Sequence, residues 1–351
     1  MHRRDLLKFL QSGLVATAAS VVVPSSAFGA PDHKGDKKDK RPIALLVPLT
    51  GERARLGLSM RQAALLAENS AFVQCFDTGG TTAGAATAAT LALKKLPALI
   101  LGPLLAEEVP AVTSTVAGRV PIISFSNDSV LKAPGTYIFG ITAAQVTSAV
   151  LRYARSRGVH SVAVIDDGSP WSAAAVLEAG HMEAELGIKV RALEVRPGTP
   201  LPDPGEVPDA VLIPGSGEAV LAAARNLKDT GVQLLGTFQA LDHRPDALAV
   251  LDGAWLASPD PVSFGTFASE FAARNGTQPG AIAGLAYDAA GIANSLRASN
   301  KLNSEGLLGA DGFHGVTGPV RFRTDGSVAR DFAIVVARPN GYEPVAVSSG
   351  S

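Results

Sequence analysis

The segment from Pro97 to Asp128 constrains the fold more than any other part of the chain. It holds two short apolar runs, Ala98–Leu101 and Val120–Ser124, which are too brief for helices and are bounded by Gly and Pro. Each run is therefore predicted to be a strand buried on both faces. Between them, valines recur at helical spacing, at Val109, Val112 and Val116. This order predicts a parallel sheet, in which ligands bind beyond the carboxyl ends of the strands.

Polar groups follow both predicted strands. The first strand is followed by the Gly102-Pro103 turn and the second by Ser126, Asn127 and Asp128. Glu107 and Glu108 lie in the first turn of the intervening helix, where the helix dipole favours acidic side chains, and Gly118 is predicted to cap its end. The segment therefore indicates a cleft at this edge of the sheet, without indicating what fills it.

Length and composition limit the classes to which the chain can belong. The 351 residues are 46% hydrophobic and 18% charged, which suits two folded domains better than one and excludes a disordered protein. The formal net charge is -1, aromatic residues make up 5%, and no motif with a basic patch or interleaved aromatic residues is present. Nucleic acid is therefore not an expected partner.

The start of the chain has the features of an export signal. Arg3 and Arg4 precede a modest apolar stretch, and the small-x-small pattern of a cleavage site follows at Ala27-Phe28-Gly29. The arginine pair resembles a twin-arginine signal, and an ordinary secretory signal with a chance arginine pair is the alternative. The polar residues from Gln11 to Gly13 disfavour a permanent membrane helix. We therefore expect residues 1–29 to direct the protein into the periplasm.

A charged segment and a single cysteine follow the signal. Residues 30–41 (APDHKGDKKDKR) contain no bulky apolar residue and are predicted to be a disordered linker. A basic tether to an anionic surface is the alternative. Cys75 lies within an apolar run, away from the cleavage site, and is expected to be a small buried hydrophobe. Neither an intramolecular disulfide nor a lipid anchor on cysteine is expected.

The folded part begins with alternating strand and helix patterns. The apolar run Ile43–Gly51 predicts a buried strand, and apolar residues at helical spacing from Leu56 to Ala67 predict a helix that packs on the sheet. A strand at Phe72–Phe76 and a helix at Thr82–Lys95 follow. Together with the segment described above, this repeat predicts an α/β fold with a doubly wound parallel sheet.

A second repeat of the same kind starts near residue 143. A helix around Val146–Ala154 and a helix at Ala173–Leu186 alternate with strands at Ser161–Ile165, Val190–Val195, Ala210–Ile213 and Leu234–Gly236. The proline-rich residues 197–208 are predicted to be a loop. Later come helices at Phe264–Arg274 and Ala281–Ala298, and then strands at Pro319–Phe322 and Phe332–Ala337. Strands that follow the late helices are expected if the chain crosses back from one domain to the other.

Several of these segments together resemble a known family. They are IALLVPLTGERARLGLSMRQAALLA, FDTGGTTAGAATAA, LILGPLLAEEVPAV, VPIISFSND and AYDAAGIANSL. In this order, between about residues 42 and 347, they resemble successive blocks of type I periplasmic binding proteins of the leucine-binding family. Within that family, GPLL followed by an acidic pair and Val is most similar to the penicillin-binding-protein activators, which are thought to regulate peptidoglycan synthases.

The resemblance implies two doubly wound lobes joined by three crossovers, with a ligand trapped between them as they close. Lobe 1 would comprise residues 42–142 and 258–318, and lobe 2 residues 143–257 and 319–347. The crossovers would fall near Ile141-Thr142, Ala257-Pro259 and Gly318-Pro319. Proline and glycine at the last two suit sharp bends at a hinge.

The ends of the predicted strands name the residues expected to line the cleft. Lobe 1 should contribute Thr50, Leu104, Leu105, Ala106, Ser126, Asn127 and Asp128. Lobe 2 should contribute Asp167, Ser169, Trp171, Ser216 and Gln239. Trp171 could cover a bound ligand or pack on its own loop. Asp128 could instead accept local backbone hydrogen bonds, and Asp166 or Asp167 could cap the helix that follows.

The sequence departs from the family at positions that bind amino acids. The resemblance implies small hydroxyl residues after the Gly-Pro turn, but Leu104, Leu105 and Ala106 stand there. It also implies Thr or Ser at the position of Asp128 and an aromatic residue at that of Ser216. The Asp128 carboxylate would repel a ligand carboxylate by about 1 kcal/mol or more. A free amino acid is therefore a disfavoured ligand.

No catalytic site is predicted. The sequence has no G-x-S-x-G, Walker-type or H-E-x-x-H motif, and its histidines are scattered, so neither an enzyme, a cofactor site nor a metal site is expected. Two functions fit the sequence. The first is a binding protein that hands a small polar, amino-acid-like ligand to an ABC-type importer in the inner membrane. The alternative is a regulatory partner of a cell-wall synthase.

Overall fold

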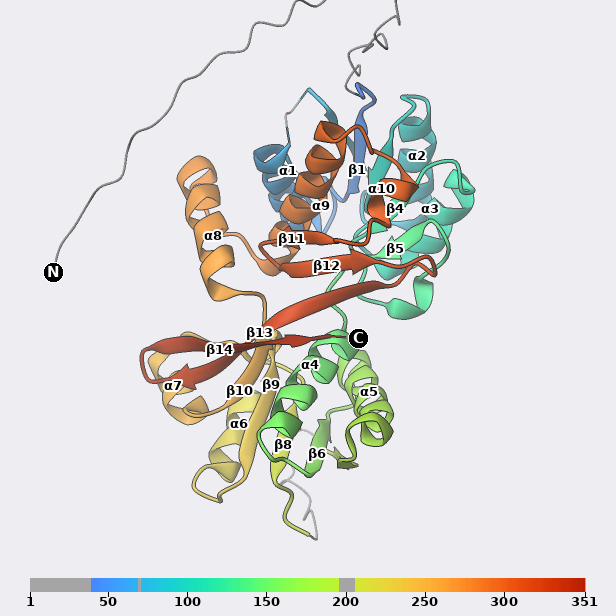
Figure 1. Ribbon diagram of the computed structural model, residues 1–351. Helices are drawn as coiled ribbons and strands as arrows, with labels where there is room; N and C mark the ends of the chain where they lie inside the picture. The colour runs from blue at the N-terminus through green and yellow to red at the C-terminus, as the bar shows by residue number, and fades with distance from the viewer. Residues whose placement is uncertain (1–38, 69–70, 196–205, 351) are drawn as a thin grey trace, which may run out of the picture. The chain divides into compact units, whose positions relative to one another are not determined.

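The computed structural model describes residues 39–68, 71–195 and 206–350, which belong to one compact unit (Figure 1). The predicted export signal, the linker up to residue 38 and most of the predicted loop at 197–208 lie outside the described residues. Within the part of the chain that is described, no helix is long and apolar enough to cross a membrane.

The first sheet, with its helices, forms lobe 1. Its five strands are all parallel and lie in the order β2-β1-β3-β4-β5. They are β1 (Ile43–Val47), β2 (Val73–Asp77), β3 (Leu99–Leu101), β4 (Ile122–Ser124) and β5 (Thr136–Ile138). The intervening helices are α1 (Ala54–Ala67), α2 (Thr82–Leu93) and α3 (Val109–Val116), with short 3-10 turns η1 (Ala106–Glu108) and η2 (Ser129–Leu131).

Strand β1 is buried on both faces, as its unbroken apolar run predicts. On one face Leu46 packs in a cluster with residues of α2 and α3. On the other face Leu45 packs in a cluster with Met60 of α1 and with residues of α9 (Ala281–Ala298). Helix α9 lies beside α1 although the two are far apart in the sequence (Figure 1). The late helical region therefore completes the first lobe.

The second sheet has the order β11-β12-β13-β10-β9-β8-β6-β7, with β14 also paired to β13. Its strands are β6 (Ser161–Asp166), β7 (Lys189–Glu194), β8 (Ala210–Ile213), β9 (Gln233–Thr237), β10 (Trp255–Ser258), β11 (Phe313–Gly315), β12 (Gly318–Phe322), β13 (Val328–Arg338) and β14 (Gly341–Ser349). The remaining helical elements are α4 (Ala143–Ser156), α5 (Pro170–Leu186), α6 (Glu218–Leu227), η3 (Phe238–Ala240), α7 (Pro245–Leu251), α8 (Pro261–Asn275) and α10 (Ser304–Leu307).

Lobe 2 is built around the parallel strands β6 to β10 of this sheet. Alternate side chains of β8 enter different clusters, because successive residues of a strand face opposite sides. Val211 and Ile213 join residues of α6 and α7, whereas Leu212 joins residues of α4 and α5. Strand β13 is antiparallel to β10, and β14 forms an edge beside β13. The two lobes are therefore both sheets covered by helices on two faces.

The third crossover lies inside β13, which corrects the expectation that placed it near Gly318-Pro319. The first part of β13 pairs with β12, and its second part pairs with β10. Phe322 of β12 packs on Tyr137 and Phe139 of lobe 1, with ring centroids 5.2 and 5.8 Å away. Gly318 and Pro319 instead begin the second strand of the β11-β12 hairpin, where Gly315 pairs with Gly318. The bend at this glycine belongs to a hairpin rather than to a hinge.

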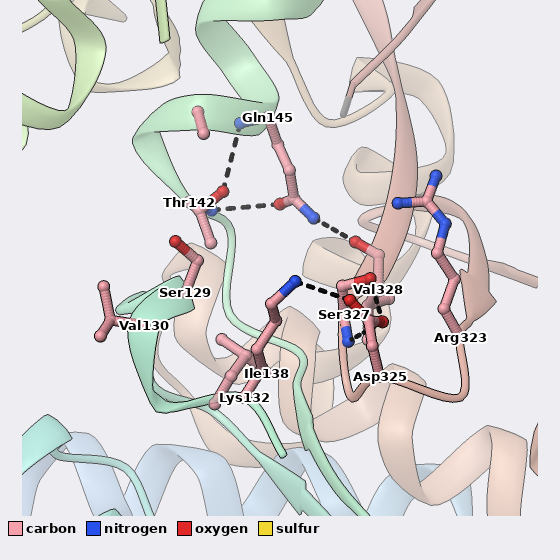
Figure 2. Close-up of a pocket in the computed structure, with 11 residues that line it drawn as sticks. Ser129, Val130, Lys132, Ile138, Thr142, Gln145, Arg323, Asp325, Ser327 and Val328 are labelled. Atoms are coloured by element: carbon pink, nitrogen blue, oxygen red, sulfur yellow. Dashed lines mark hydrogen bonds and ion pairs between the residues drawn. The ribbon is translucent and has the colours of Figure 1, made fainter. Parts of the chain in front are cut away.

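The first crossover runs from β5 to α4 and is tied to β13. Thr142 and Gln145 form a capping box, in which the Thr142 hydroxyl accepts from the Gln145 amide and the Gln145 side chain accepts from the Thr142 amide. The Gln145 side-chain amide also donates to the Val328 carbonyl (Figure 2). Lys132 and Asp325, which form an ion pair of 2.6 Å, line a pocket of about 480 Å³ at this place.

A buried polar network holds the crossovers together. Arg330 of β13 is 1% exposed and donates to the carbonyl oxygens of Phe139, at 2.8 Å, and Thr317, at 3.2 Å. Asp288 of α9 accepts from the amides of Val316 and Thr317 at 2.7 and 2.8 Å. Burial raises the pKa of Asp288 and lowers the pKa of Arg330 to about 10. The arginine thus joins the first and third crossovers in one hydrogen-bonded unit.

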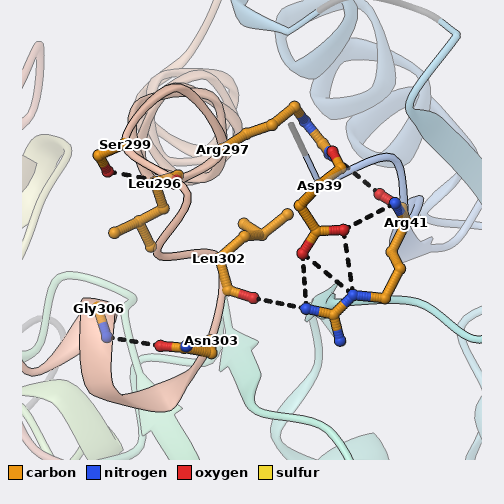
Figure 3. A network of polar contacts seen from close by, with 8 residues as sticks. All are labelled: Asp39, Arg41, Leu296, Arg297, Ser299, Leu302, Asn303 and Gly306. Carbon is orange, nitrogen blue, oxygen red and sulfur yellow. Dashed lines mark hydrogen bonds and ion pairs between the residues drawn. The ribbon is translucent and has the colours of Figure 1, made fainter. Parts of the chain in front are cut away.

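Residues 39–41, the described part of the segment expected to be a linker, are bonded to lobe 1. The Arg41 guanidinium forms an ion pair of 2.6 Å with the Asp39 carboxylate and donates a hydrogen bond to the Leu302 carbonyl (Figure 3). Arg297 of α9 donates to the main-chain oxygens of Asp39 and Arg41 at 2.6 and 2.9 Å. The neighbouring Arg41 lowers the pKa of Asp39. Residues 39–41 are therefore anchored to lobe 1 by charged side chains, which composition alone does not predict.

Three local details differ from the prediction: the cap of α3, the place of Glu108 and the burial of Cys75. Helix α3 buries Val109, Val112 and Val116 as expected, but its cap is Ala117, in the left-handed conformation with φ of 49°. Glu108 is not in the first turn of α3 but ends η1 just before it. The half-buried Cys75 has a pKa raised by burial.

Candidate functional site

A pocket of about 550 Å³ lies between the lobes, at the carboxyl ends of strands from both sheets. Lobe 1 contributes the loops after β3 and β4, the start of α1 and the start of α9, and lobe 2 contributes the start of α5 and η3. The lining residues are Arg53, Leu56, Leu104, Leu105, Ala106, Phe125, Asn127, Gly140, Ile141, Trp171, Phe238, Gln239, Ala281, Ile282 and Leu285. Most of these side chains are apolar, so the pocket offers few polar anchors to a ligand.

The loop after β3 turns its own polar groups inward. The Leu105 amide donates to Glu108 Oε2 at 3.1 Å, and Glu108 is fully buried. Burial raises the pKa of the Glu108 carboxyl. Because the Leu105 amide already has an acceptor, it does not offer a hydrogen bond to a ligand carboxylate.

Trp171 is held rigidly at the other wall. It lies in the first turn of α5, whose N-cap is Ser169. Its indole nitrogen donates to the Pro214 carbonyl at 3.0 Å, and its ring packs edge-on against Phe238 with centroids 5.9 Å apart. Trp171 therefore packs on Pro214 and Phe238, from other segments of lobe 2, and also lines the pocket. That it covers a ligand stays a prediction.

Arg53 is the one charged residue among the described residues that line the pocket. It stands at the N-cap position of α1 without a side-chain capping bond, and its exposed side chain has no hydrogen bond or ion pair with another described residue. The neutral amides of Asn127 and Gln239 are the other polar side chains of the lining. The pocket thus combines one unpaired positive charge with apolar walls, which suits an anion with an apolar body.

A model of the periplasmic binding protein family matches residues 41–342. The chain belongs to this family. Family membership implies a periplasmic location. No curated protein sequence matches the chain.

Solved structures share the fold of this periplasmic binding protein at low sequence identity. A protein from Rhodospirillum rubrum assigned to a branched-chain amino acid ABC transporter has a TM-score of 0.75 at 19% identity, covering 87% of this chain and 99% of its own. The C-domain of LpoA from Haemophilus influenzae, a regulator of PBP1A, has a TM-score of 0.69 at 16% identity, covering 87% and 100%. A solute-binding protein from R. palustris in complex with benzoate has a TM-score of 0.61 at 15% identity, covering 89% and 98%. The fold is that of a two-lobed type I binding protein, as the resemblance implies.

About half of the residues expected to line the cleft of this binding protein border the pocket. They are Leu104, Leu105, Ala106, Asn127, Trp171 and Gln239. All six follow the carboxyl end of a strand, which is the rule that selected them.

The other expected residues do not line this pocket, and most of them are hydrogen-bonded to other groups of their own lobe. The Thr50 hydroxyl donates to Asp77 at 2.7 Å. The buried Ser126 hydroxyl accepts from the Asp128 amide, and Asp128 accepts from the Val130 amide at 3.0 Å. Three expected residues remain. Asp167 accepts a hydrogen bond from the Ser169 amide, and Ser169 caps α5. Ser216 is exposed. The local-bond interpretation of Asp128 describes its contacts, and hydrogen bonds from Ser169 lower the pKa of Asp167.

Sequence reasoning missed the charged residue of the pocket and several apolar ones. Arg53 lies two residues after the Thr50-Gly51 turn that follows β1, so the strand-end rule could have included it. Phe125 lies inside the ISFSND segment, directly after β4. Phe238 directly follows β9, so the strand-end rule could have included it as well. Ala281 and Ile282 reach the pocket only because α9 returns to lobe 1, for which the sequence holds no local signal.

Among the residues that the structure describes, no group of three or more His, Cys, Asp or Glu side chains is placed to hold a metal ion.

Proposed function

We propose that this periplasmic binding protein binds a small organic anion between its lobes and delivers it to an ABC importer in the inner membrane. The observation that carries the proposal is the unpaired Arg53 in a pocket whose other walls are mainly apolar and come from both lobes. A ligand that contacts both lobes favours the closed arrangement by its differential affinity, which is how a binding protein signals occupancy.

The charges of the pocket favour a carboxylate over an amino acid. An amino acid brings an ammonium group as well as a carboxylate, and the described lining contains no Asp or Glu to pair with the ammonium. The Leu105 amide is already bonded to Glu108. A monocarboxylate with a compact apolar body needs only the Arg53 cation and the walls formed by Trp171 and Ile282. The benzoate complex of the R. palustris protein is an example of such a ligand on this fold.

Export is part of the same proposal. We propose that residues 1–29 direct the chain to the periplasm by the twin-arginine route, on the strength of Arg3 and Arg4 ahead of the apolar stretch.

A thermal-shift series on the protein purified from the periplasm tests the ligand class. Benzoate and benzamide have nearly the same shape and differ in charge, so we expect benzoate to raise the melting temperature and benzamide to have little effect. Leucine tests the amino-acid alternative. A shift with leucine and none with benzoate would overturn the proposed ligand class.

A regulatory role in peptidoglycan synthesis is the second candidate. It is favoured by the fold shared with the LpoA C-domain and by the internally bonded loop at Leu105. This role predicts that the purified protein binds a peptidoglycan synthase with equal affinity whether or not benzoate is present. Surface-immobilised synthase measures this directly, and no binding would exclude the role for the synthase tested.

A further inference from the structure

A second pocket, of about 490 Å³, adjoins the ligand pocket. It is lined by Phe238, Leu241, His243, Ser258, Pro259, Pro261, Phe264, Gly265, Gly280, Ala281, Val335 and Tyr342. Two of these residues, Phe238 and Ala281, also line the ligand pocket. The two pockets therefore meet at these side chains. We call the second pocket the rear groove, and it is bounded by the second crossover, α8, the start of α9 and the β13-β14 pair.

The rear groove is the more apolar of the two pockets. None of the described residues that line it is Asp, Glu, Lys or Arg. The Tyr342 hydroxyl accepts from the Asp242 amide at 2.8 Å and donates to the Asp242 carbonyl at 2.9 Å, so its polar end is already paired. The His243 ring packs edge-on against the Tyr342 ring, with centroids 5.2 Å apart. Aromatic and proline carbons thus form the surface that a ligand would meet.

The two side chains that the pockets share differ in size and in how they are held. Phe238 begins η3, where Thr237 donates to the Pro214 carbonyl at 2.8 Å and accepts from the Gln239 amide at 3.3 Å. The Trp171 indole donates to the same carbonyl. The Pro214 oxygen therefore accepts hydrogen bonds from Trp171 and from Thr237, the residue before Phe238. The other shared residue is Ala281, whose methyl group occupies little space. The two pockets therefore have the apolar side chains of Phe238 and Ala281 in common.

We propose that the ligand is an elongated monocarboxylate, with its carboxylate at Arg53 and an apolar chain that passes between Phe238 and Ala281 into the rear groove. The inference rests on the proposed function and adds the length of the ligand to it. The positive charge belongs to the ligand pocket, and no Asp, Glu, Lys or Arg is among the described residues that line the rear groove. Burying one methylene group contributes about 0.8 kcal/mol, which corresponds to about fourfold in affinity.

Calorimetry with a series of ω-phenylalkanoates tests this length dependence. The series starts at benzoate and adds methylene groups one at a time, and the protein is the full exported chain. We expect the dissociation constant to fall by up to about fourfold per methylene once the chain enters the groove, and then to level off when the groove is full.

A substitution in the groove locates the effect. Gly265 lies in α8 and lines only the rear groove, and a side chain there meets no atom within 4 Å. Gly265→Leu should abolish the gain with chain length and leave benzoate affinity unchanged, which also shows that the variant is folded. Thr266→Leu is the control, because it adds a similar apolar side chain at an exposed position of the same helix outside the groove lining.

The outcomes separate the two proposals. A gain with length that Gly265→Leu removes and Thr266→Leu retains supports the rear groove as part of the site. Benzoate binding without any gain in the longer acids would overturn this inference and leave the proposed function intact. No binding by any acid of the series would overturn both.

Discussion

Two arginines of this protein stand in opposite environments. Arg330 is fully buried at the crossovers and donates to carbonyl oxygens of Phe139 and Thr317. Arg53 is exposed and lines the pocket, and its side chain has no partner among the described residues. A buried cation without partners would cost several kcal/mol, so Arg330 must be bonded internally, whereas solvent satisfies Arg53 until a ligand replaces it. The difference separates a residue that maintains the fold from one that is available for recognition.

Removing Arg330 should have the largest effect on stability. Arg330→Met leaves the carbonyls of Phe139 and Thr317 without their donor and Asp288 without a nearby cation, so we expect a loss of about 3 kcal/mol or more in the free energy of unfolding. Urea denaturation measures this loss. Arg53→Gln is the matched control and should stay within about 0.5 kcal/mol of the original protein. Equal losses of unfolding free energy in Arg330→Met and Arg53→Gln would contradict the distinction between a structural and a ligand-binding arginine.

Removing the Trp171 ring should affect ligand binding more than stability. Trp171→Ala deletes the aromatic wall and its edge-on contact with Phe238, so we expect benzoate affinity to fall by about tenfold. The exposed Leu177 lies on the same helix outside the pocket, and Leu177→Ala should retain full affinity. Isothermal titration of both variants distinguishes a pocket wall from a general weakening of α5.

The buried Glu108 predicts a dependence of stability on pH. Its folded-state pKa is raised by burial above the ordinary 4.5, so its contribution to stability is present below that value and is lost as pH rises through the folded-state pKa. Glu108→Gln keeps an acceptor for the Leu105 amide and removes the titration. We expect the stability of this variant relative to the original protein to increase from pH 4 to pH 7 in urea denaturation, whereas the exposed neighbour substitution Glu107→Gln should show no such trend. A flat difference would show that Glu108 does not titrate in this range.

The smallest effect is expected at the exposed ion pair between Lys132 and Asp325. The pair is short, at 2.6 Å, and lowers the pKa of Asp325, but both side chains are largely exposed (Figure 2). Exposed pairs contribute about 0.2 to 1 kcal/mol, and salt screens them. Lys132→Gln should therefore lower the free energy of unfolding by no more than this amount. A larger loss would mean that the hinge depends on surface charge as well as on Arg330.

The main elements of the fold could be predicted from the sequence because they carry strong periodic patterns. Strand β8 and helix α9 have the predicted bounds, since a buried apolar run and an uninterrupted helical stripe leave few alternatives. The edge strand β14 was missed because its exposed and half-buried residues, with Pro344 among them, carry no clear alternation. Gly318 and Pro319 indicate a bend but do not say whether it is a hairpin or a crossover, and the structure has a hairpin there.

The site was predictable only where the strand-end rule applies. That rule finds Trp171 and Asn127, because each follows a strand of its own sheet. It cannot tell which polar groups are already bonded locally, and so it also selects Thr50 and Asp128. Residues such as Ala281 depend on α9 returning to lobe 1 from a distant part of the chain.

The affinity of the exported protein for benzoate, with and without Arg53, tests the central claim most directly. Arg53→Gln removes the unpaired charge, and Arg55→Gln removes the same charge from an exposed position two residues away that does not line the pocket. Isothermal titration should show benzoate bound by the original protein and by Arg55→Gln with equal affinity, and at least about tenfold more weakly by Arg53→Gln, since a hydrogen bond to a charged group contributes about 1.5 kcal/mol or more. Benzoate binding that is unchanged in Arg53→Gln would contradict the account.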